Sequence, residues 1–215
     1  MVKVWVSPEA GERYLSWLDG GYIAKAIQKP GFLWARRYHL EQSNEAGWTG
    51  QIIVYGLDSV DSLERYLKSS ARKKILREAE AFKDVSKAEK FHGTIDFELT
   101  STGHTLDDEA PVLYCGRFSV APKSHQQLFE WLDGKHIKEV ISQPGFLWAR
   151  RVHLEGCDED GWERYIIIYG LASREILEEY FNNPIRERFF RERDPFTKDL
   201  RTENFFGTAE FALDK

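Results

Sequence analysis

The order of apolar and polar positions predicts a strand followed by an interrupted helix at the start of the chain. Residues 2–6, Val-Lys-Val-Trp-Val, alternate with a period of two, which is the pattern of a half-buried strand. Ser7, Pro8 and Glu9 then supply an N-cap, a proline at the first helical position and an acid in the first turn. Apolar residues continue at helical spacing, but residues 19–21, Asp-Gly-Gly, interrupt them, so we expect the helix to bend or restart there.

The following patterns predict two more strands, two more helices and a last strand. Aromatic and β-branched residues favour strands over residues 32–40 and 52–55. Capping residues at Asp58-Ser59 and at Ser69-Ser70 each begin a helix. In residues 91–99 apolar and polar positions alternate, so one face of this last strand is expected to meet a core.

The same pattern occurs twice, because the chain contains an internal repeat. The octapeptide Pro-Gly-Phe-Leu-Trp-Ala-Arg-Arg stands at residues 30–37 and again, unchanged, at residues 144–151, 114 positions later. At this offset 16 of the 24 residues of segment 17–40 are identical to those of segment 131–154. A repeat of about a hundred residues predicts two similar domains. We assign the first repeat to residues 1–100, a linker to 101–111 and the second repeat to 112–215.

The order of elements in each repeat predicts the fold class. A strand, helix, strand, strand, helix, strand order, here with an extra helix before the last strand, is the split βαβ plan of ferredoxin-like domains. We therefore predict an α+β protein of two tandem ferredoxin-like units. One sheet face of each unit would remain uncovered, so we expect the units to pair sheet against sheet as a fused, pseudo-dimeric α+β barrel with the helices outside.

Composition and charge narrow the classes of partner. The formal net charge of −5 argues against nucleic acid, which requires a basic surplus on one face. No run of eighteen apolar residues and no signal-peptide core is present, so we expect no membrane partner and a cytoplasmic location. Cys115 and Cys157 form no ligand spacing, and no phosphate loop or metal motif occurs, so we expect no metal and no cofactor.

The repeated motif resembles a known superfamily. The segment from Lys135-His136-Ile137 to the octapeptide 144–151 is similar to that of dimeric α+β barrel proteins, and among these to EthD-like and related uncharacterised bacterial proteins. The resemblance implies a fused pseudo-dimer. Such relatives include cofactor-independent monooxygenases, muconolactone isomerases, polyketide cyclases and haem-binding enzymes. In the isomerase-like relatives a histidine on the first helix acts on the substrate, and the matching residues here would be His136 and, in the first repeat, Tyr22.

His136 and the repeated arginines are the leading candidates for chemistry. A neutral imidazole at a helix break could transfer a proton near neutral pH. Arg150 and Arg151 are adjacent on a strand and must point to opposite faces, as must Arg36 and Arg37. An arginine inside a cavity could hold an oxyanion. The alternative is that the arginines form internal ion pairs with acids of the last strands, namely Asp96, Glu98 and Glu210.

Further residues could line a substrate pocket. They are the repeated aromatic and histidine positions Trp34, His39, Trp148, His153 and Tyr169, together with Tyr22, Arg36 and Arg37. The alternative is that the large rings fill the core and the histidines are structural.

These residues lead to one functional hypothesis and two alternatives. We expect a cofactor-independent enzyme, of the isomerase, lyase or cyclase type, that acts on a small aromatic or unsaturated anionic metabolite. His136 would move a proton, and Arg150 or Arg151 would hold the oxyanion. The alternatives are a non-catalytic small-molecule binding barrel and a haem-binding barrel. A small-molecule ligand is the expected partner, with an internal pseudo-dimer and possible further homo-oligomers.

Overall fold

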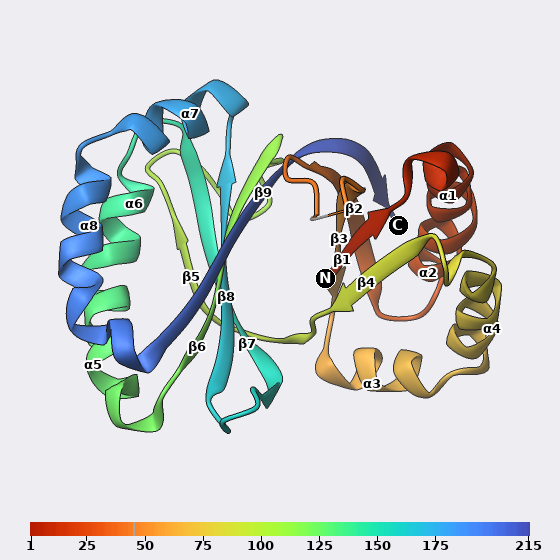
Figure 1. Cartoon of the computed structure of the whole chain (residues 1–215), viewed down its shortest axis with the longest axis horizontal. Coiled ribbons are helices and arrows are strands. Elements are labelled where there is room, and N and C mark those ends of the chain that lie inside the picture. Colours follow the sequence, from red (N-terminus) through yellow and green to blue (C-terminus); the bar gives the residue numbers. More distant parts are fainter. Residues whose placement is uncertain (45) are drawn as a thin grey trace. The chain divides into compact units, whose positions relative to one another are not determined.

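The computed structural model describes residues 1–44 and 46–215, which form two compact units (Figure 1). Unit 1 consists of Met1–Phe91 and Ala209–Lys215, and unit 2 of His92–Thr208. Each unit has its own hydrophobic core between a sheet and helices.

Unit 1 is an antiparallel sheet with helices packed against it. Its strands stand in the order β4-β1-β3-β2, followed by the end of β9. The strands are β1 (Val2–Val6), β2 (Phe32–Leu40), β3 (Thr49–Leu57) and β4 (Ser86–Lys90). The helices are α1 (Gly11–Trp17), α2 (Ala24–Ile27), α3 (Val60–Lys68) and α4 (Ser70–Ala79), with short 3₁₀ turns at Pro8–Ala10 and Glu80–Phe82. The strands predicted at 2–6 and 32–40 are confirmed, whereas the sequence pattern did not predict β4.

Unit 2 repeats this plan. Its strands stand in the order β9-β6-β8-β7-β5, and the pairs β9–β6, β6–β8, β8–β7 and β7–β5 are antiparallel. The strands are β5 (Gly93–Thr100), β6 (Val112–Val120), β7 (Phe146–Cys157), β8 (Glu163–Leu171) and β9 (Leu200–Asp214). The helices are α5 (His125–Trp131), α6 (Ile137–Ile141), α7 (Arg174–Asn182) and α8 (Ile185–Arg193), with 3₁₀ turns at Pro122–Ser124 and Asp194–Asp199. The predicted α+β class is therefore confirmed.

The last strand of each repeat crosses between the compact units. Strand β5, which ends the first repeat, pairs with β7 and belongs to unit 2. Strand β9 pairs with β6 over Leu200–Thr208, and the part from Ala209 onwards belongs to unit 1. The compact units thus differ in their bounds from the sequence repeats 1–100 and 112–215, and the segment 101–111 assigned as a linker lies within unit 2.

The apolar face predicted for residues 91–99 is only partly correct. Phe97 and Leu99 pack against the core of unit 2. Ile95 is 47% exposed, because the register of β5 against β7 shifts between Ile95 and Phe97 and interrupts the alternation.

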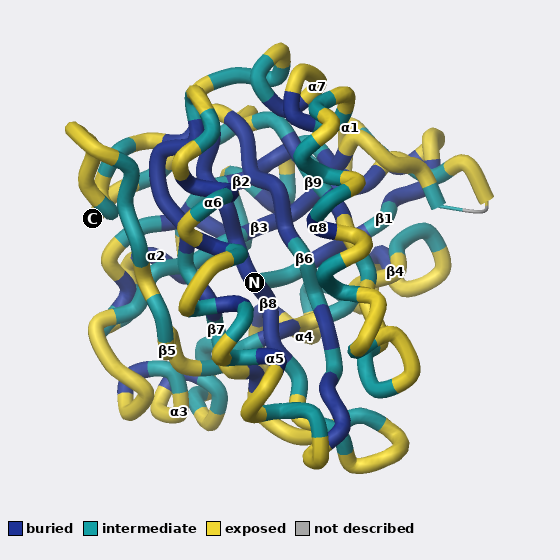
Figure 2. Tube along the Cα trace, turned by 90° about the vertical axis from the view of Figure 1, so that its left-hand side faces the viewer, coloured by how far each residue is buried: buried dark blue, intermediate teal, exposed yellow. Residues whose placement is uncertain are grey.

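The interruption predicted at residues 19–21 is a π-helical turn, and unit 2 contains a second one. The turns span Leu18–Ile23 in unit 1 and Leu132–His136 in unit 2, each continuous with the helices before and after it. A π-turn widens the helix locally and re-aims the side chains that follow. Figure 2 shows long buried stretches in β3, β6 and β8 and exposed residues on the outer helical turns. Leu18 and Ile23 of the first π-turn and Leu132 of the second belong to the hydrophobic core of their own unit.

The turn before β7 generates a prediction about stability. Gly145 has φ of 75°, and a Cβ there would lie 2.1 Å from Cδ1 of Ile176. We expect Gly145→Ala to lower the free energy of unfolding by more than about 2 kcal/mol, because left-handed backbone alone costs a non-glycine residue about 1–2 kcal/mol. Two controls separate the causes. Gly103→Ala, with φ of 85° but nothing within 4 Å, should lose only the backbone part, and Gly134→Ala, also with nothing within 4 Å, should lose neither. If urea denaturation shows equal losses of unfolding free energy for Gly145→Ala and Gly103→Ala, the side chain of Ile176 moves aside without an energetic cost.

The position of β5 generates a second prediction. A fragment of residues 112–215 lacks β5, so the edge of β7 loses its hydrogen-bonded neighbour. A fragment of residues 92–208 keeps every strand segment assigned to unit 2. We expect fragment 92–208 to unfold at higher urea concentration, and fragment 112–215 to associate or aggregate in size-exclusion chromatography. Two fragments of equal stability would contradict the importance of this pairing.

Candidate functional site

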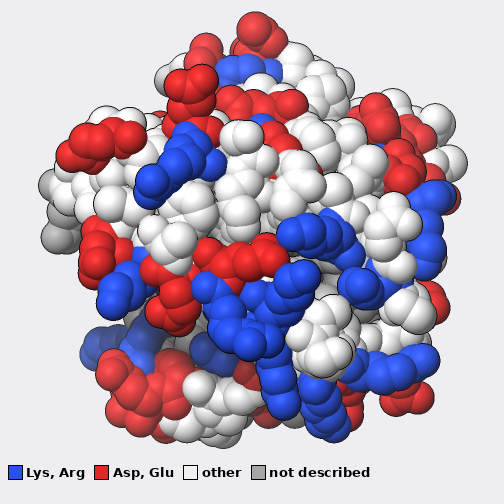
Figure 3. Space-filling model, turned by 90° about the vertical axis from the view of Figure 1, so that its right-hand side faces the viewer, with Lys and Arg blue, Asp and Glu red and all other residues white. Residues whose placement is uncertain are grey.

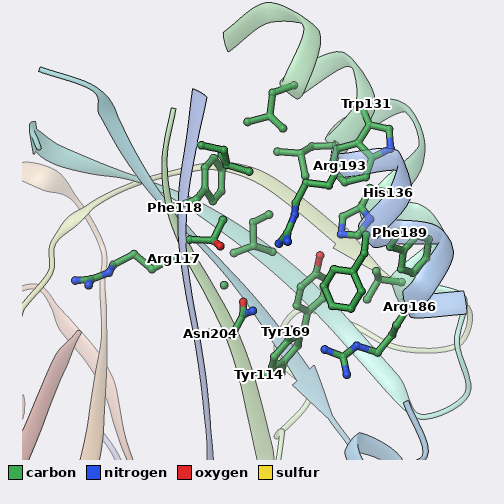
Figure 4. A pocket seen from close by; sticks show the side chains of 18 of the residues that line it. Tyr114, Arg117, Phe118, Trp131, His136, Tyr169, Arg186, Phe189, Arg193 and Asn204 are labelled. Carbon is green, nitrogen blue, oxygen red and sulfur yellow. The ribbon is translucent and has the colours of Figure 1, made fainter. Parts of the chain in front are cut away.

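Unit 2 contains a cavity between its sheet and its helices. The cavity has a volume of about 110 Å³ and is bordered by residues of β6, β8, β9, α5, the π-turn and α8 (Figure 4). Its walls are largely apolar, with Phe118, Leu128, Trp131, Ile167 and Phe189 among the lining residues. Apolar walls with a few polar groups are the usual composition of a small-molecule site.

His136 reaches this cavity from the π-turn. Its ring stacks on Trp131 with a centroid distance of 4.4 Å and meets Phe189 edge to face at 4.7 Å. The buried Nδ1 atom has no hydrogen-bond partner. Burial lowers the pKa of His136 from 6.5 to about 4, and the carboxylate of Glu192 opposes this shift only in part. The imidazole is therefore neutral at pH 7, with a ring nitrogen available to a ligand.

Tyrosine hydroxyls form a second polar group along the cavity. Tyr169 on β8 is 4% exposed, and its buried hydroxyl has no hydrogen-bond partner. Burial raises the pKa of Tyr169 well above 10, so the hydroxyl stays protonated and can donate. Tyr114 on β6 stacks against Tyr169 at 6.0 Å, and burial raises its pKa as well, with the positive charge of Arg186 opposing the shift.

Two arginines on α8 give the cavity a positive charge. The guanidinium groups of Arg186 and Arg193 lie 5.3 and 5.2 Å from the ring centroid of Phe190. Arg186 also donates to the carbonyl oxygen of Phe181. Within residues 1–44 and 46–215 neither arginine forms an ion pair with a carboxylate. Uncompensated guanidinium groups beside a cavity favour an anionic ligand.

Of the residues predicted from the sequence, His136 and Tyr169 line this cavity. The arginines of the repeated motif do not. Arg151 is 4% exposed, donates to Asp96 at 2.9 Å and to Asp133, and lies 4.1 Å from the ring centroid of Phe129. It is thus held by the internal ion pairs that the sequence left open as an alternative.

The other three predicted arginines are also paired inside their own units. Arg37 donates to Asp19 at 2.8 Å, to Gln51 at 2.8 Å and to Glu210. Arg150 donates to Glu98 at 2.9 Å. Arg36 donates to Asp214 at 2.8 Å.

The remaining predicted residues lie apart from the cavity. Trp148 donates from Nε1 to the carbonyl oxygen of Asp108 at 2.9 Å. His153 stacks on Tyr165 at 4.6 Å. His39 lies 3.5 Å from the side-chain nitrogen of Gln51 in unit 1.

Trp34 and Tyr22 belong to unit 1. Trp34 stands on β2 beside Arg36, whose guanidinium lies 5.8 Å from its ring centroid. Tyr22 lies in the π-turn of unit 1 and packs against Trp17 at 5.5 Å.

Sequence reasoning missed Tyr114, Arg186, Arg193 and Asn204, all of which line the cavity. Asn204 lies on β9. Arg186 and Arg193 fall on a helix rich in charge, where such residues are usually solvated. Their one available signal was the pair Phe189-Phe190 between them, which places an apolar patch next to cations.

In residues 1–44 and 46–215 no group of three or more His, Cys, Asp or Glu side chains could hold a metal ion. Among the helices of this same part of the chain, none has the length and apolar character needed to cross a membrane.

Comparisons with known proteins place the fold and leave the activity open. A family model described as "Domain of unknown function (DUF4286)" matches residues 112–189. No curated protein sequence matches the chain. Among solved structures, an anthrone oxidase-like protein superposes with a TM-score of 0.70 and 13% identity, covering 99% of this chain and 91% of its own.

Two further solved structures are similar over nearly their whole length. A candidate monooxygenase from Fusobacterium nucleatum subsp. nucleatum ATCC 25586 has a TM-score of 0.66 and 10% identity, covering 100% of this chain and 93% of that one. A candidate monooxygenase from Lactobacillus acidophilus NCFM has a TM-score of 0.59 and 13% identity, covering 99% and 97%. At such low identity these similarities establish the fold alone.

Proposed function

We propose that unit 2 binds a small, flat, anionic or acidic molecule in its cavity and transfers a proton to or from it without a cofactor. The observation that carries this proposal is the pair of buried polar atoms along the cavity, Nδ1 of His136 and the hydroxyl of Tyr169, that have no protein partner. Buried polar groups in native proteins nearly always have a partner, so an orphaned pair beside a cavity points to a ligand.

The size of the cavity limits the ligand. An apolar cavity of roughly 150 Å³ accommodates benzene. The cavity of about 110 Å³ therefore suits a molecule, or the part of a molecule, no larger than one small ring. A haem macrocycle is several times larger, so the haem-binding alternative is not supported by this site.

The electrostatics suit proton removal from a carbon or oxygen acid. Neutral His136 can accept the proton at Nδ1, while the protonated hydroxyl of Tyr169 can donate to the oxygen that becomes negative. The guanidinium groups of Arg186 and Arg193 favour the resulting anion. A bound anion next to His136 would also raise its low pKa towards the range in which it is an effective base.

Proton removal is compatible with more than one overall reaction. Return of the proton to a different atom gives an isomerase, whereas reaction of the carbanion with oxygen gives the kind of activity in the names of the similar structures, anthrone oxidase-like and monooxygenase. The isomerase, lyase or cyclase type stays a prediction. So do the roles of Arg150 and Arg151 in holding an oxyanion, the EthD-like likeness, the tandem duplication and the pairing of the units as a fused barrel.

Deuterium exchange tests the proposed proton transfer with model carbon acids in place of the natural substrate. In D₂O, wild-type protein should accelerate the exchange of hydrogen for deuterium at the acidic carbon of 2-cyclohexenone or phenylpyruvate. NMR measures the rate of this exchange. His136→Gln should slow this exchange by about 10²–10⁴-fold, the usual contribution of a general base. His125→Gln is the matched control, because His125 lies on α5 and does not line the cavity. Comparison with and without oxygen then separates isomerisation from oxidation.

A binding-only protein would behave differently in the same experiment. Binding of either probe without exchange, unchanged by His136→Gln, would support the non-catalytic alternative and contradict proton transfer by His136.

The low pKa of His136 predicts a pH dependence of stability. The imidazole has a pKa of about 4 when folded and 6.5 ordinarily, so the unfolded chain binds this proton more readily. The contribution of His136 to the free energy of unfolding is fully present above pH 6.5 and is lost progressively as the pH falls towards 4. Relative to His136→Phe, the unfolding free energy of the wild-type protein should fall by up to about 3 kcal/mol over this pH window, since one pKa unit corresponds to about 1.4 kcal/mol. Urea denaturation at pH 7.5 and pH 4.5 measures the difference, and parallel losses in both proteins would contradict a buried neutral imidazole.

A further inference from the structure

Helix α8 supplies an acid to the aromatic ring that stacks on His136. Oε2 of Glu192 accepts a hydrogen bond from Nε1 of Trp131 at 3.2 Å. The indole of Trp131 stacks on the imidazole of His136 with a centroid distance of 4.4 Å and an interplanar angle of 25° (Figure 4). Trp131 thus connects the carboxylate of Glu192 to the imidazole.

The carboxylate of Glu192 is itself held through its other oxygen. Nζ of Lys135 donates to Oε1 at 2.6 Å, and Nε of Arg188 lies 3.7 Å from the same atom. The hydrogen bond from Lys135 keeps the pKa of Glu192 below its usual range, so the group is ionised at neutral pH. Lys135 directly precedes His136 in the π-turn. Glu192 therefore contacts both the residue that stacks on His136 and the residue before it in the chain.

Unit 1 contains the same acid but pairs it differently. Glu78 stands 114 positions before Glu192 and accepts a hydrogen bond from Nζ of Lys25 at 3.1 Å. Figure 3 shows acidic and basic side chains next to one another on the face of unit 1 that carries its helices. Among the described residues, the buried Nε1 atom of Trp17, the counterpart of Trp131, has no hydrogen-bond partner. The acid of unit 1 therefore does not hold the indole.

Two sequence differences between the repeats account for the different pairing. The counterpart of Lys25 in unit 2 is Glu139, so the cation that takes the acid in unit 1 is replaced by a second acid. The counterpart of Gly21 is Lys135, so unit 2 has a new cation in its π-turn. Both differences direct Glu192 towards the π-turn, and they occur in the unit that has the histidine.

The hydrogen bond to Trp131 matters because few contacts orient the imidazole. Nδ1 of His136 is buried without a hydrogen-bond partner among the described residues, and the ring is held by Trp131 and by an edge-to-face contact with Phe189 at 4.7 Å. A general base must point its nitrogen at the proton that it removes. A hydrogen bond to an ionised acceptor is roughly twice as strong as one between neutral groups, so Glu192 restrains the indole firmly.

We infer that Glu192 is a positioning residue of the site in unit 2, which keeps the imidazole of His136 in place by holding the indole of Trp131 against it. Its role in the reaction rests on the proton transfer proposed above, whereas the contacts themselves are present in the free protein. The charge of Glu192 acts in the same direction. Burial lowers the pKa of His136 and Arg193 lowers it further, but Glu192 raises it and so favours the imidazolium that proton transfer forms.

NMR of the free full-length protein tests this positioning without a ligand. The face of an indole shifts the protons of a stacked imidazole upfield, so the ring protons of His136, assigned by comparison with His136→Gln, should lie upfield of the ordinary histidine range. Glu192→Ala removes the acceptor of the indole N–H, and most of this upfield shift should be lost. Glu192→Gln keeps a side-chain oxygen for the indole and should retain most of it.

One control and one further variant make the NMR result decisive. Glu187→Gln removes an exposed acid from the same helix that does not border the cavity, and it should leave the signals of His136 unchanged. Lys135→Met removes the hydrogen bond on the other carboxylate oxygen and should shift the same protons in the same direction by less, which covers the case that Glu192→Ala does not fold. Unchanged His136 signals in every folded variant of Glu192 and Lys135, or an equal change in Glu187→Gln, would overturn the inference.

Deuterium exchange separates this inference from the proposed proton transfer. If wild-type protein catalyses the exchange, Glu192→Ala should lower kcat by about 10²-fold with a smaller change in KM, since a misplacement of about 1 Å has such an effect. Glu192→Gln should recover most of the rate. Unchanged kcat in folded Glu192→Ala would contradict the positioning role. Absence of exchange in wild-type protein, together with the expected NMR shifts, would contradict the proton transfer and still support the positioning of His136 by Glu192.

Discussion

A buried arginine ties three segments together in each unit, and the position of the candidate site depends on it. In unit 2 Arg151 on β7 donates to Asp133 in the π-turn and to Asp96 on β5. A guanidinium keeps its charge at any physiological pH, so a buried one is stable only while its acid partners stay in place. The arginine thereby fixes the place where the π-turn meets the sheet. His136 follows Asp133 by three residues in that same turn, and Arg37 holds the turn of unit 1 through Asp19 in the same way.

The same ion pairs connect each central arginine to the last strand of the other repeat. Arg151 receives Asp96 from β5, which the first repeat encodes, and Arg37 receives Glu210 from the end of β9. Each of these two networks thus contains one acid from the last strand of the other sequence repeat. A repeat folded on its own would leave its central arginine with a single acid. Ion pairing as well as backbone pairing therefore favours the observed positions of the last strands.

The sequence predicts the elements well because local patterns determine them, but it does not predict which strand pairs with which. Alternation in residues 91–99 predicts an apolar face but does not indicate which unit's core that face joins. Two residues that line the cavity could be singled out from the sequence. His136 differs from its counterpart in the first repeat, and Tyr169 is the same in both repeats. The sequence does not predict Arg186 and Arg193 as site residues, because the sequence pattern of a charged helix is the same whether its cations face solvent or a cavity. The arginines of the motif drew attention by their repetition, which the ion pairs of Arg37 and Arg151 explain.

Side-chain size differs between the units at equivalent positions of the layer between sheet and helices. Tyr14 in unit 1 stands where unit 2 has Leu128, and it packs against Trp17 at 5.4 Å and Phe82 at 5.1 Å. In unit 2 the smaller Leu128 and His136 border a cavity large enough for a small ring. In the proposed reaction this space lets unit 2 bind a ring by apolar contact and place His136 against its acidic proton.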